Sequence, residues 1–114
     1  MESVTLDRKT ILQQELQRLI GILKAAHSTE KILLFGSLSS GTVHDDSDLD
    51  LVVVERTDSP FWRRQREMRR RLQPRIGVDL LVYTPAEFEQ LCRERPFFRD
   101  EVLAKGKVLY EQSQ

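Results

Sequence analysis

The chain has 114 residues, with 18 Lys and Arg balanced by 18 Asp and Glu and with 39% hydrophobic residues. This length fits one small layered core, so we expect a single domain over residues 1–114, and the composition excludes a disordered chain. The longest apolar runs, 32–35 and 51–54, are too short to span a bilayer, so no membrane contact is expected. No signal-peptide pattern opens the sequence, and Cys92 is its single cysteine, which excludes an internal disulfide and favours the reducing cytoplasm.

The first half of the chain predicts one helix followed by two strands. Apolar residues recur at three- and four-residue spacing from Leu12 to Leu23, which indicates an amphipathic helix over residues 7–26. The apolar run at 31–36 ends in glycine and is typical of a short buried strand. β-Branched residues predict a second strand at 48–55.

The second half predicts helices alternating with strands, at 60–72 (helix), 76–84 (strand), 85–94 (helix), 96–106 (short helical turn) and 107–111 (edge strand). Ser59 is expected to cap the first of these helices, with Pro60 at its first position. Thr84 and Glu87 have the spacing of a capping box at the start of the next helix. Helices that alternate with short apolar strands indicate an α/β or α+β domain, in which the helices pack on a small sheet.

Four of the chain's aspartates fall between Asp45 and Asp50, where like charges repel one another. An EF-hand calcium loop that starts at Asp46 would need glycine at its sixth position and glutamate at its twelfth, but the chain has Leu51 and Thr57 there. A phosphate-binding P-loop is excluded as well, because the two glycines with the right spacing are not followed by the required lysine. Asp45 and Asp46 are interpreted as solvated loop residues.

The second strand offers an explanation for Asp48 and Asp50. Residues two apart on a strand point to the same face, so these two carboxylates are expected to project together. Asp79 lies inside an apolar strand, and if strands 48–55 and 76–83 are neighbours, the three carboxylates meet at one point. Such crowding is tolerated when a cation neutralises it, when one carboxylate keeps a proton, or when water screens it. An all-oxygen ligand set favours Mg²⁺ or Mn²⁺, and a pair of such ions is a standard device for nucleotidyl transfer.

Gly36 and Ser37 follow directly on the first predicted strand. Small residues at such a turn let a phosphate group approach the main chain, where N–H groups and the Ser37 hydroxyl can donate hydrogen bonds. A Gly-Ser turn or a D-x-D pair alone is common in proteins. The two together, with the carboxylate of Asp79, indicate a nucleotide site.

These residues resemble the motif G-S-x10-D-x-D of the minimal nucleotidyltransferases, a branch of the superfamily that includes DNA polymerase β. The resemblance covers residues 30–83, and the ending 103–111 is also similar to that branch. The fold that it implies is α+β, a small mixed β-sheet with helices packed on one side, which agrees with the elements derived above.

The resemblance also implies a role for each residue of the motif. Gly36 and Ser37 would bind the phosphates of a nucleotide. Asp48, Asp50 and Asp79 would hold the metal ions, with two Mg²⁺ or Mn²⁺ ions expected in the active complex. Asp79 would be a ligand of the catalytic metal and would help to deprotonate the attacking hydroxyl.

The implied activity is metal-dependent transfer of a nucleoside monophosphate from an NTP, with ATP expected, to a hydroxyl, with release of pyrophosphate. The chain is too short for a large acceptor domain, so we expect the acceptor on a small helical HEPN-type partner, as in toxin–antitoxin pairs, or across a homo-oligomer interface. Many family members have arginines where this chain has Leu38 and Ser40. Their absence favours an alternative, an antitoxin-like module that neutralises a HEPN-type partner by contact with little catalysis.

Residues 58–75 contain seven arginines and two acids, so the neutral total hides a basic segment. Phe61, Met68 and Leu72 form the expected core stripe of this helix, which leaves the arginines mostly on solvated faces. The segment from Arg63 to Arg75 could then recognise a polyanion such as RNA. A nucleic-acid-binding protein is the third and least favoured interpretation, because the net charge of the chain is zero.

Overall fold

Helices and strands alternate along the chain in a computed structural model that describes residues 7–112 and leaves residues 1–6 and 113–114 undescribed. The elements are α1 (Arg8–Lys24), β1 (Thr29–Phe35), α2 (Gly36–Ser40), β2 (Leu49–Glu55), α3 (Phe61–Leu72), β3 (Val78–Tyr83), α4 (Pro85–Glu94), the π-helix η1 (Phe97–Ala104) and β4 (Lys107–Glu111). Each predicted element is present, and only the five-residue α2 was not predicted. Among the described residues, no helix has the length and apolar character that a bilayer crossing requires.

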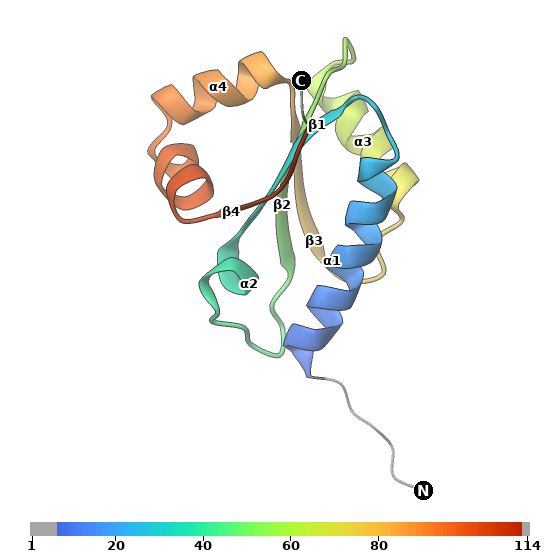
Figure 1. Cartoon of the computed structure of the whole chain (residues 1–114), viewed down its shortest axis with the longest axis vertical. Coiled ribbons are helices and arrows are strands. Elements are labelled where there is room, and N and C mark those ends of the chain that lie inside the picture. The colour runs from blue at the N-terminus through green and yellow to red at the C-terminus, as the bar shows by residue number, and fades with distance from the viewer. Residues whose placement is uncertain (1–6, 113–114) are drawn as a thin grey trace, which may run out of the picture.

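The strands form one mixed sheet in the order β3-β2-β1-β4 (Figure 1). β1 runs antiparallel to both of its neighbours, β2 and β4, whereas β2 and β3 run parallel. Two parallel strands need a long crossover connection, and α3 supplies it. The predicted α+β class and mixed sheet are confirmed, and β4 lies at an edge as predicted.

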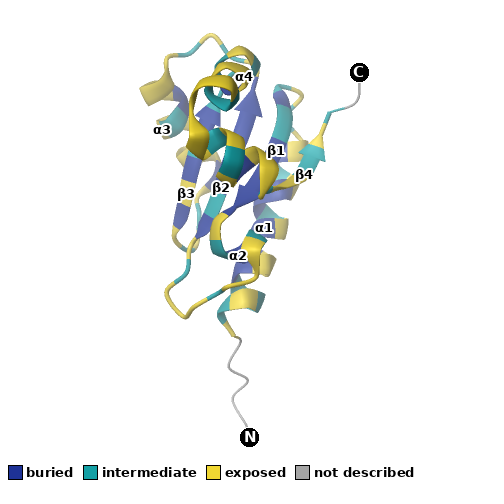
Figure 2. Cartoon of the chain, turned by 90° about the vertical axis from the view of Figure 1, so that its left-hand side faces the viewer, coloured by how far each residue is buried: buried dark blue, intermediate teal, exposed yellow. Residues whose placement is uncertain are grey.

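Helices cover both faces of this sheet, with α1 and α3 on one face and α4 and η1 on the other (Figure 1). The expectation of helices on one side therefore describes α1 and α3 but leaves out α4 and η1. The physical reason is that the central strands are apolar on both faces. Leu34 and Leu51 pack in the core that contains α1, whereas Leu33 and Val52 pack with Phe88 of α4. Figure 2 shows buried residues along the strands and exposed residues on the outer surfaces of the helices.

The start of one helix agrees with the sequence prediction and the start of another does not. At α4, the Thr84 side chain accepts a hydrogen bond from the Glu87 N–H, and the Glu87 side chain accepts one from the Thr84 N–H, so the predicted capping box is confirmed. At α3, the prediction of Ser59 as N-cap is wrong by one residue. Pro60 takes that position because it keeps an extended ψ of 158°, and the helix begins at Phe61.

Side chains of α3 cover the outer edge of β3. Arg64 Nη1 donates to the Val82 carbonyl at 3.2 Å, and Arg69 Nη2 donates to the Val78 carbonyl at 2.6 Å. Between them, the Gln65 amide donates to the Leu80 carbonyl and accepts from the Val82 N–H, both at 2.6 Å. Main-chain groups at the edge of a sheet need partners, and α3 provides them.

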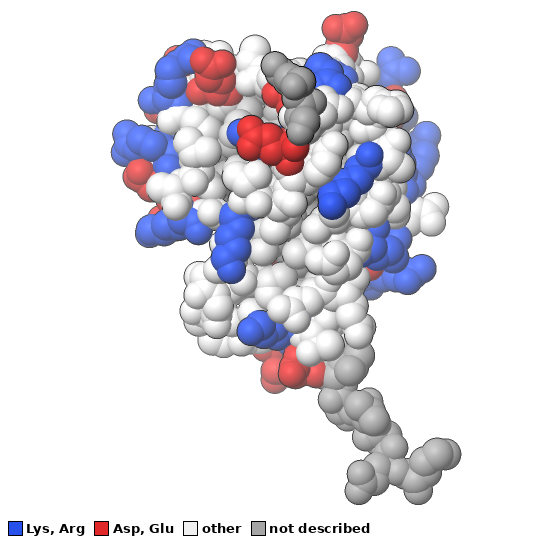
Figure 3. Space-filling view, in the orientation of Figure 1, with Lys and Arg blue, Asp and Glu red and all other residues white. Residues whose placement is uncertain are grey.

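The prediction that the arginines of α3 mostly face solvent is confirmed for five of the six, and Arg64 is the exception. Arg64 is buried, with 7% of its surface exposed, and it also contacts the carboxylate of Glu87. Arg71 lies 3.5 Å from Glu55, and Arg63 lies 3.0 Å from Glu67. On the face of the molecule in Figure 3, Lys and Arg side chains are spread over both flanks instead of forming one continuous basic patch. Carboxylate partners take up part of the positive charge of α3, and nothing in the structure supports a nucleic-acid interface at 63–75.

Candidate active site

The two acidic strands are neighbours, which is the condition under which their carboxylates were expected to meet. β2 and β3 are parallel neighbours, and Asp50 lies opposite Asp79 in their register. Leu49 and Leu51 are fully buried in the core that contains α1, so Asp50 between them points to the opposite face of the sheet. The carboxyl groups of Asp50 and Asp79 are within hydrogen-bonding reach of each other. Two carboxylates from distant parts of the sequence therefore meet at one place.

The electrostatics of this pair favour a bound proton or a cation. Burial raises the pKa of Asp50 to about 6, and the carboxylates of Asp79 and Asp48 add to the effect by repulsion. Near neutral pH the group thus titrates instead of carrying a permanent charge. The donors are carboxylate oxygens, which are the ligands that Mg²⁺ and Mn²⁺ prefer. The chemistry of the site consequently fits a divalent cation.

Asp48 stands next to this pair, in the loop just before β2. Its Oδ1 atom lies 3.5 Å from Arg8 Nη2, and Arg8 Nε donates to the Ser47 carbonyl at 2.8 Å. Within residues 7–112, no three Asp, Glu, His or Cys side chains are arranged as a metal-ligand group. The structure therefore brings Asp50 and Asp79 together and holds Asp48 beside them against Arg8. The role of Asp48 as a third ligand stays a prediction.

Two glycines make room for the carboxylates. Gly36 has a φ of +74°, and a Cβ atom there would lie 2.1 Å from Asp50 Oδ2, so neither the backbone nor the space admits a side chain. A Cβ atom on Gly77 would lie 2.3 Å from Asp48 Oδ1. The sequence singled out Gly36 but missed Gly77. Its only signal is its position two residues before Asp79, where a turn glycine is the ordinary interpretation.

The Gly-Ser turn is the start of the short helix α2. The Ser37 carbonyl accepts hydrogen bonds from the Gly41 N–H at 2.9 Å and from the Ser40 hydroxyl at 3.2 Å, which closes the turn. Ser37 itself is half-buried. At the two positions where arginines are expected, Leu38 is buried in the core and Ser40 is exposed. Neither brings a positive charge to the turn.

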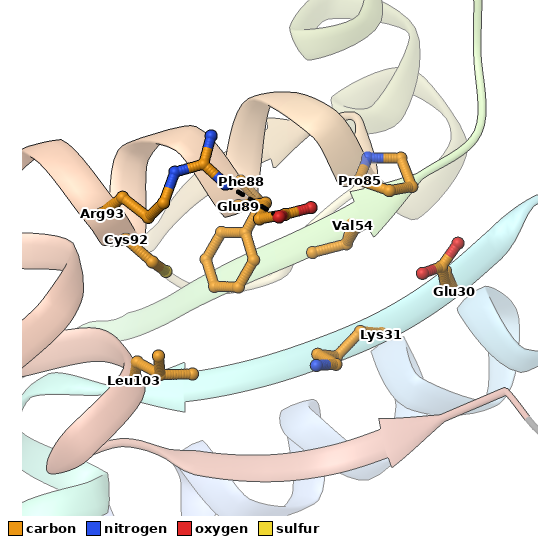
Figure 4. Close-up of a pocket in the computed structure, with 9 residues that line it drawn as sticks. All are labelled: Glu30, Lys31, Val54, Pro85, Phe88, Glu89, Cys92, Arg93 and Leu103. Atoms are coloured by element: carbon orange, nitrogen blue, oxygen red, sulfur yellow. Dashed lines mark hydrogen bonds and ion pairs between the residues drawn. The ribbon is translucent and has the colours of Figure 1, made fainter.

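A separate cavity of about 440 Å³ lies on the face covered by α4 and η1 (Figure 4). Its lining includes the apolar side chains of Val54, Phe88 and Leu103, with Lys31 beneath them on β1. Cys92 also lines it, and burial raises the pKa of this thiol. None of the predicted site residues borders this cavity, so it is distinct from the acidic site.

The comparison with family profiles identifies the class of protein. The profile of the family described as "Polymerase beta, Nucleotidyltransferase" matches residues 17–114. Because this match spans most of the chain, the chain belongs to that family, and the resemblance found in its motif is confirmed. No curated protein matches the chain.

Solved structures similar to this chain share its fold. A candidate nucleotidyltransferase from Sulfolobus solfataricus superimposes with a TM-score of 0.66 at 17% identity, over 91% of this chain and 84% of that one. A toxin–antitoxin complex solved with AMP-PNP gives a TM-score of 0.50 at 24% identity, over 86% and 74%. The complex of a tri-AMPylated Shewanella oneidensis HEPN toxin with its MNT antitoxin gives 0.50 at 23% identity, over 89% and 73%. At these identities the likeness extends to the fold alone.

Proposed function

We propose that this protein transfers a nucleoside monophosphate from an NTP, with ATP as the expected donor, to a hydroxyl acceptor. The observation that carries the proposal is the pairing of Asp50 with Asp79, in register on parallel strands and beside the Gly36 turn. A purely structural sheet gains nothing from two carboxylates in contact on one face. The family to which the chain belongs supports the same reaction class.

The acidic residues would hold the divalent cations. Asp48, Asp50 and Asp79 offer carboxylate oxygens, and Mg²⁺ or Mn²⁺ bound there supplies charge neutralisation and an acceptor hydroxyl of lowered pKa. Asp79 accepts the proton of that hydroxyl in this proposal, since it lies beside Asp50 and is exposed. Asp50 is the more buried of the two and serves mainly as a ligand.

The Gly36 turn would receive the phosphates. The absence of a Cβ atom leaves the main chain of Gly36 in contact with the Asp50 carboxylate, so a phosphate bound there lies next to the acidic pair. The Ser37 hydroxyl, in the first turn of α2, would donate a hydrogen bond to it. Binding and neutralisation of the triphosphate thus occur on adjacent residues of β1, α2 and β2.

The acceptor is proposed to lie on a partner chain. The fold is shared with an MNT antitoxin bound to an AMPylated HEPN toxin and with a toxin–antitoxin complex that contains AMP-PNP. A hydroxyl on a HEPN-type protein encoded beside this chain is therefore the proposed substrate.

The test uses ATP labelled at the α-phosphate, with Mg²⁺ or Mn²⁺, in the presence and absence of the co-encoded neighbour. We expect label on the neighbour, and we expect Asp48→Asn and Asp79→Asn each to abolish it. Asp46→Asn is the matched control, because Asp46 is an exposed loop residue near the site and its variant should transfer label normally. The absence of label in every combination would refute the proposed activity.

A second candidate function is supported by two features beside the acidic pair. Asp48 forms an ion pair with Arg8, and the Gly36 turn has Leu38 and Ser40 where arginines are expected. These features suit an antitoxin-like module that neutralises a HEPN-type partner by contact. Tight binding of the neighbour that is unchanged in Asp48→Asn, together with no label transfer, would establish this function in place of catalysis.

A further inference from the structure

The residues that follow η1 lie against the Gly36 turn. A hollow of about 140 Å³ is lined by Gly36, Ser39 and Ser40 from the turn and by Glu101 and Lys105 from the segment around η1. These two segments are far apart in the sequence. The hollow therefore places a lysine next to the residues proposed to receive phosphate.

The main chain at this point is held firmly against the sheet. A Cβ atom on Gly106 would lie 2.1 Å from the Val102 carbonyl oxygen and 2.9 Å from the Leu34 carbonyl oxygen, so only glycine permits this approach. The Lys105 N–H donates to the Asp100 carbonyl at 3.1 Å, which closes the end of η1. These contacts fix the backbone of Lys105 beside the last residues of β1.

The side chain of Lys105 is free to change its partner. Its Nζ atom lies 3.0 Å from Glu101 Oε1, one turn away on the same segment, and the two side chains are 71% and 50% exposed. An ion pair of this kind is weak because water screens it and two long side chains must be ordered. A phosphate group, with more charge than a carboxylate, competes effectively for such a lysine.

We propose that Lys105 binds the outer phosphates of the nucleoside triphosphate. From the end of η1 it supplies the positive charge that the turn lacks at Leu38 and Ser40. Glu101 acts in the opposite sense, because it repels the phosphates and holds Lys105 in their absence. The assignment rests on the proposed function, since it takes a nucleoside triphosphate as the ligand of the Gly36 turn.

The test is the affinity of the protein for ATP and for AMP, each with Mg²⁺, measured by calorimetry. We expect Lys105→Gln to weaken ATP binding by about tenfold, the loss of one charge-assisted hydrogen bond, and AMP binding by less than about twofold. Glu101→Gln should tighten ATP binding. Lys24→Gln is the matched control, because it removes the same charge from the exposed end of α1 and should leave both affinities unchanged.

Equal losses for ATP and AMP, or no loss for ATP, would overturn the assignment to the outer phosphates. Lys105→Arg keeps the positive charge and should retain ATP binding. If Lys105→Arg loses ATP binding and Lys105→Gln also loses AMP binding, the role of Lys105 is merely structural. Unchanged ATP binding in Lys105→Gln, with label transfer still dependent on Asp48, overturns this inference and leaves the proposed function intact. A wild-type protein that binds no ATP overturns both.

Discussion

Replacing Gly36 by alanine tests how the fold makes room for its central carboxylate. Gly36 and Gly41 both have positive φ angles, of +74° and +87°, so alanine is strained at each by about 1–2 kcal/mol. Only at Gly36 does the added Cβ atom also meet a carboxylate, at 2.1 Å from Asp50 Oδ2, whereas nothing lies within 4 Å of the one on Gly41. We therefore expect a larger loss in the free energy of unfolding for Gly36→Ala than for Gly41→Ala, and a displaced Asp50 in Gly36→Ala alone.

The assay combines urea unfolding with the binding of Mn²⁺ followed by electron paramagnetic resonance. Gly41→Ala should bind Mn²⁺ like the wild type, whereas Gly36→Ala should lose roughly tenfold or more in affinity, as is typical when the supports of a metal ligand are disturbed. Gly77→Ala completes the set. No positive φ is found there, and its Cβ atom would meet Asp48 Oδ1 at 2.3 Å, so it should weaken Mn²⁺ binding without the backbone strain. Equal Mn²⁺ affinity in all four proteins would refute the reasoning.

Two further predictions concern protonation. Asp79→Asn should lower the pKa of Asp50 from about 6 toward its ordinary 3.8, because it removes a repelling carboxylate. Carbon-13 NMR of the Asp50 carboxyl group measures this pKa. An unchanged value would mean that burial alone raises it. Arg64 beside Glu87 lowers the pKa of Glu87 to about 2, so this pair stabilises the fold fully above pH 4.5 and loses its contribution as the pH falls toward 2. The free energy of unfolding from pH 6 to 2 should fall less steeply in Glu87→Gln than in the wild type, while Glu89→Gln, which alters an exposed pair, keeps the wild-type slope.

The sequence predicted the acidic pair because the pattern of the strands is so regular. Leu49 and Leu51 flank Asp50 on β2 and were expected in the core, which assigns Asp50 to the opposite face, and an acid in the apolar β3 strand has no structural explanation of its own. Given that β2 and β3 are neighbours, Asp79 had to lie near Asp50. The resemblance to a family then gave these residues their chemistry.

Contacts between distant segments could not be predicted in this way. Arg8 contacts Asp48 from the start of α1, and no local pattern connects a helix N-terminus with a loop forty residues later. The burial of Arg64 and the contacts of Arg69 with β3 were missed for a related reason. Composition shows how many charges a helix carries, but it does not show which main-chain groups of a neighbouring strand need a donor.

The covered edge of β3 has a consequence for how this sheet can be extended. A strand that approached β3 from outside would first have to displace Arg64, Gln65 and Arg69 from the main-chain groups that they bind. At the other edge, among the residues that the structure describes, no strand or side chain is hydrogen-bonded to the outer side of β4. Of the two edges of the sheet, only the β4 edge is therefore open to pairing with another strand. An extended segment of another chain that joins the sheet aligns beside β4, away from the acidic strands.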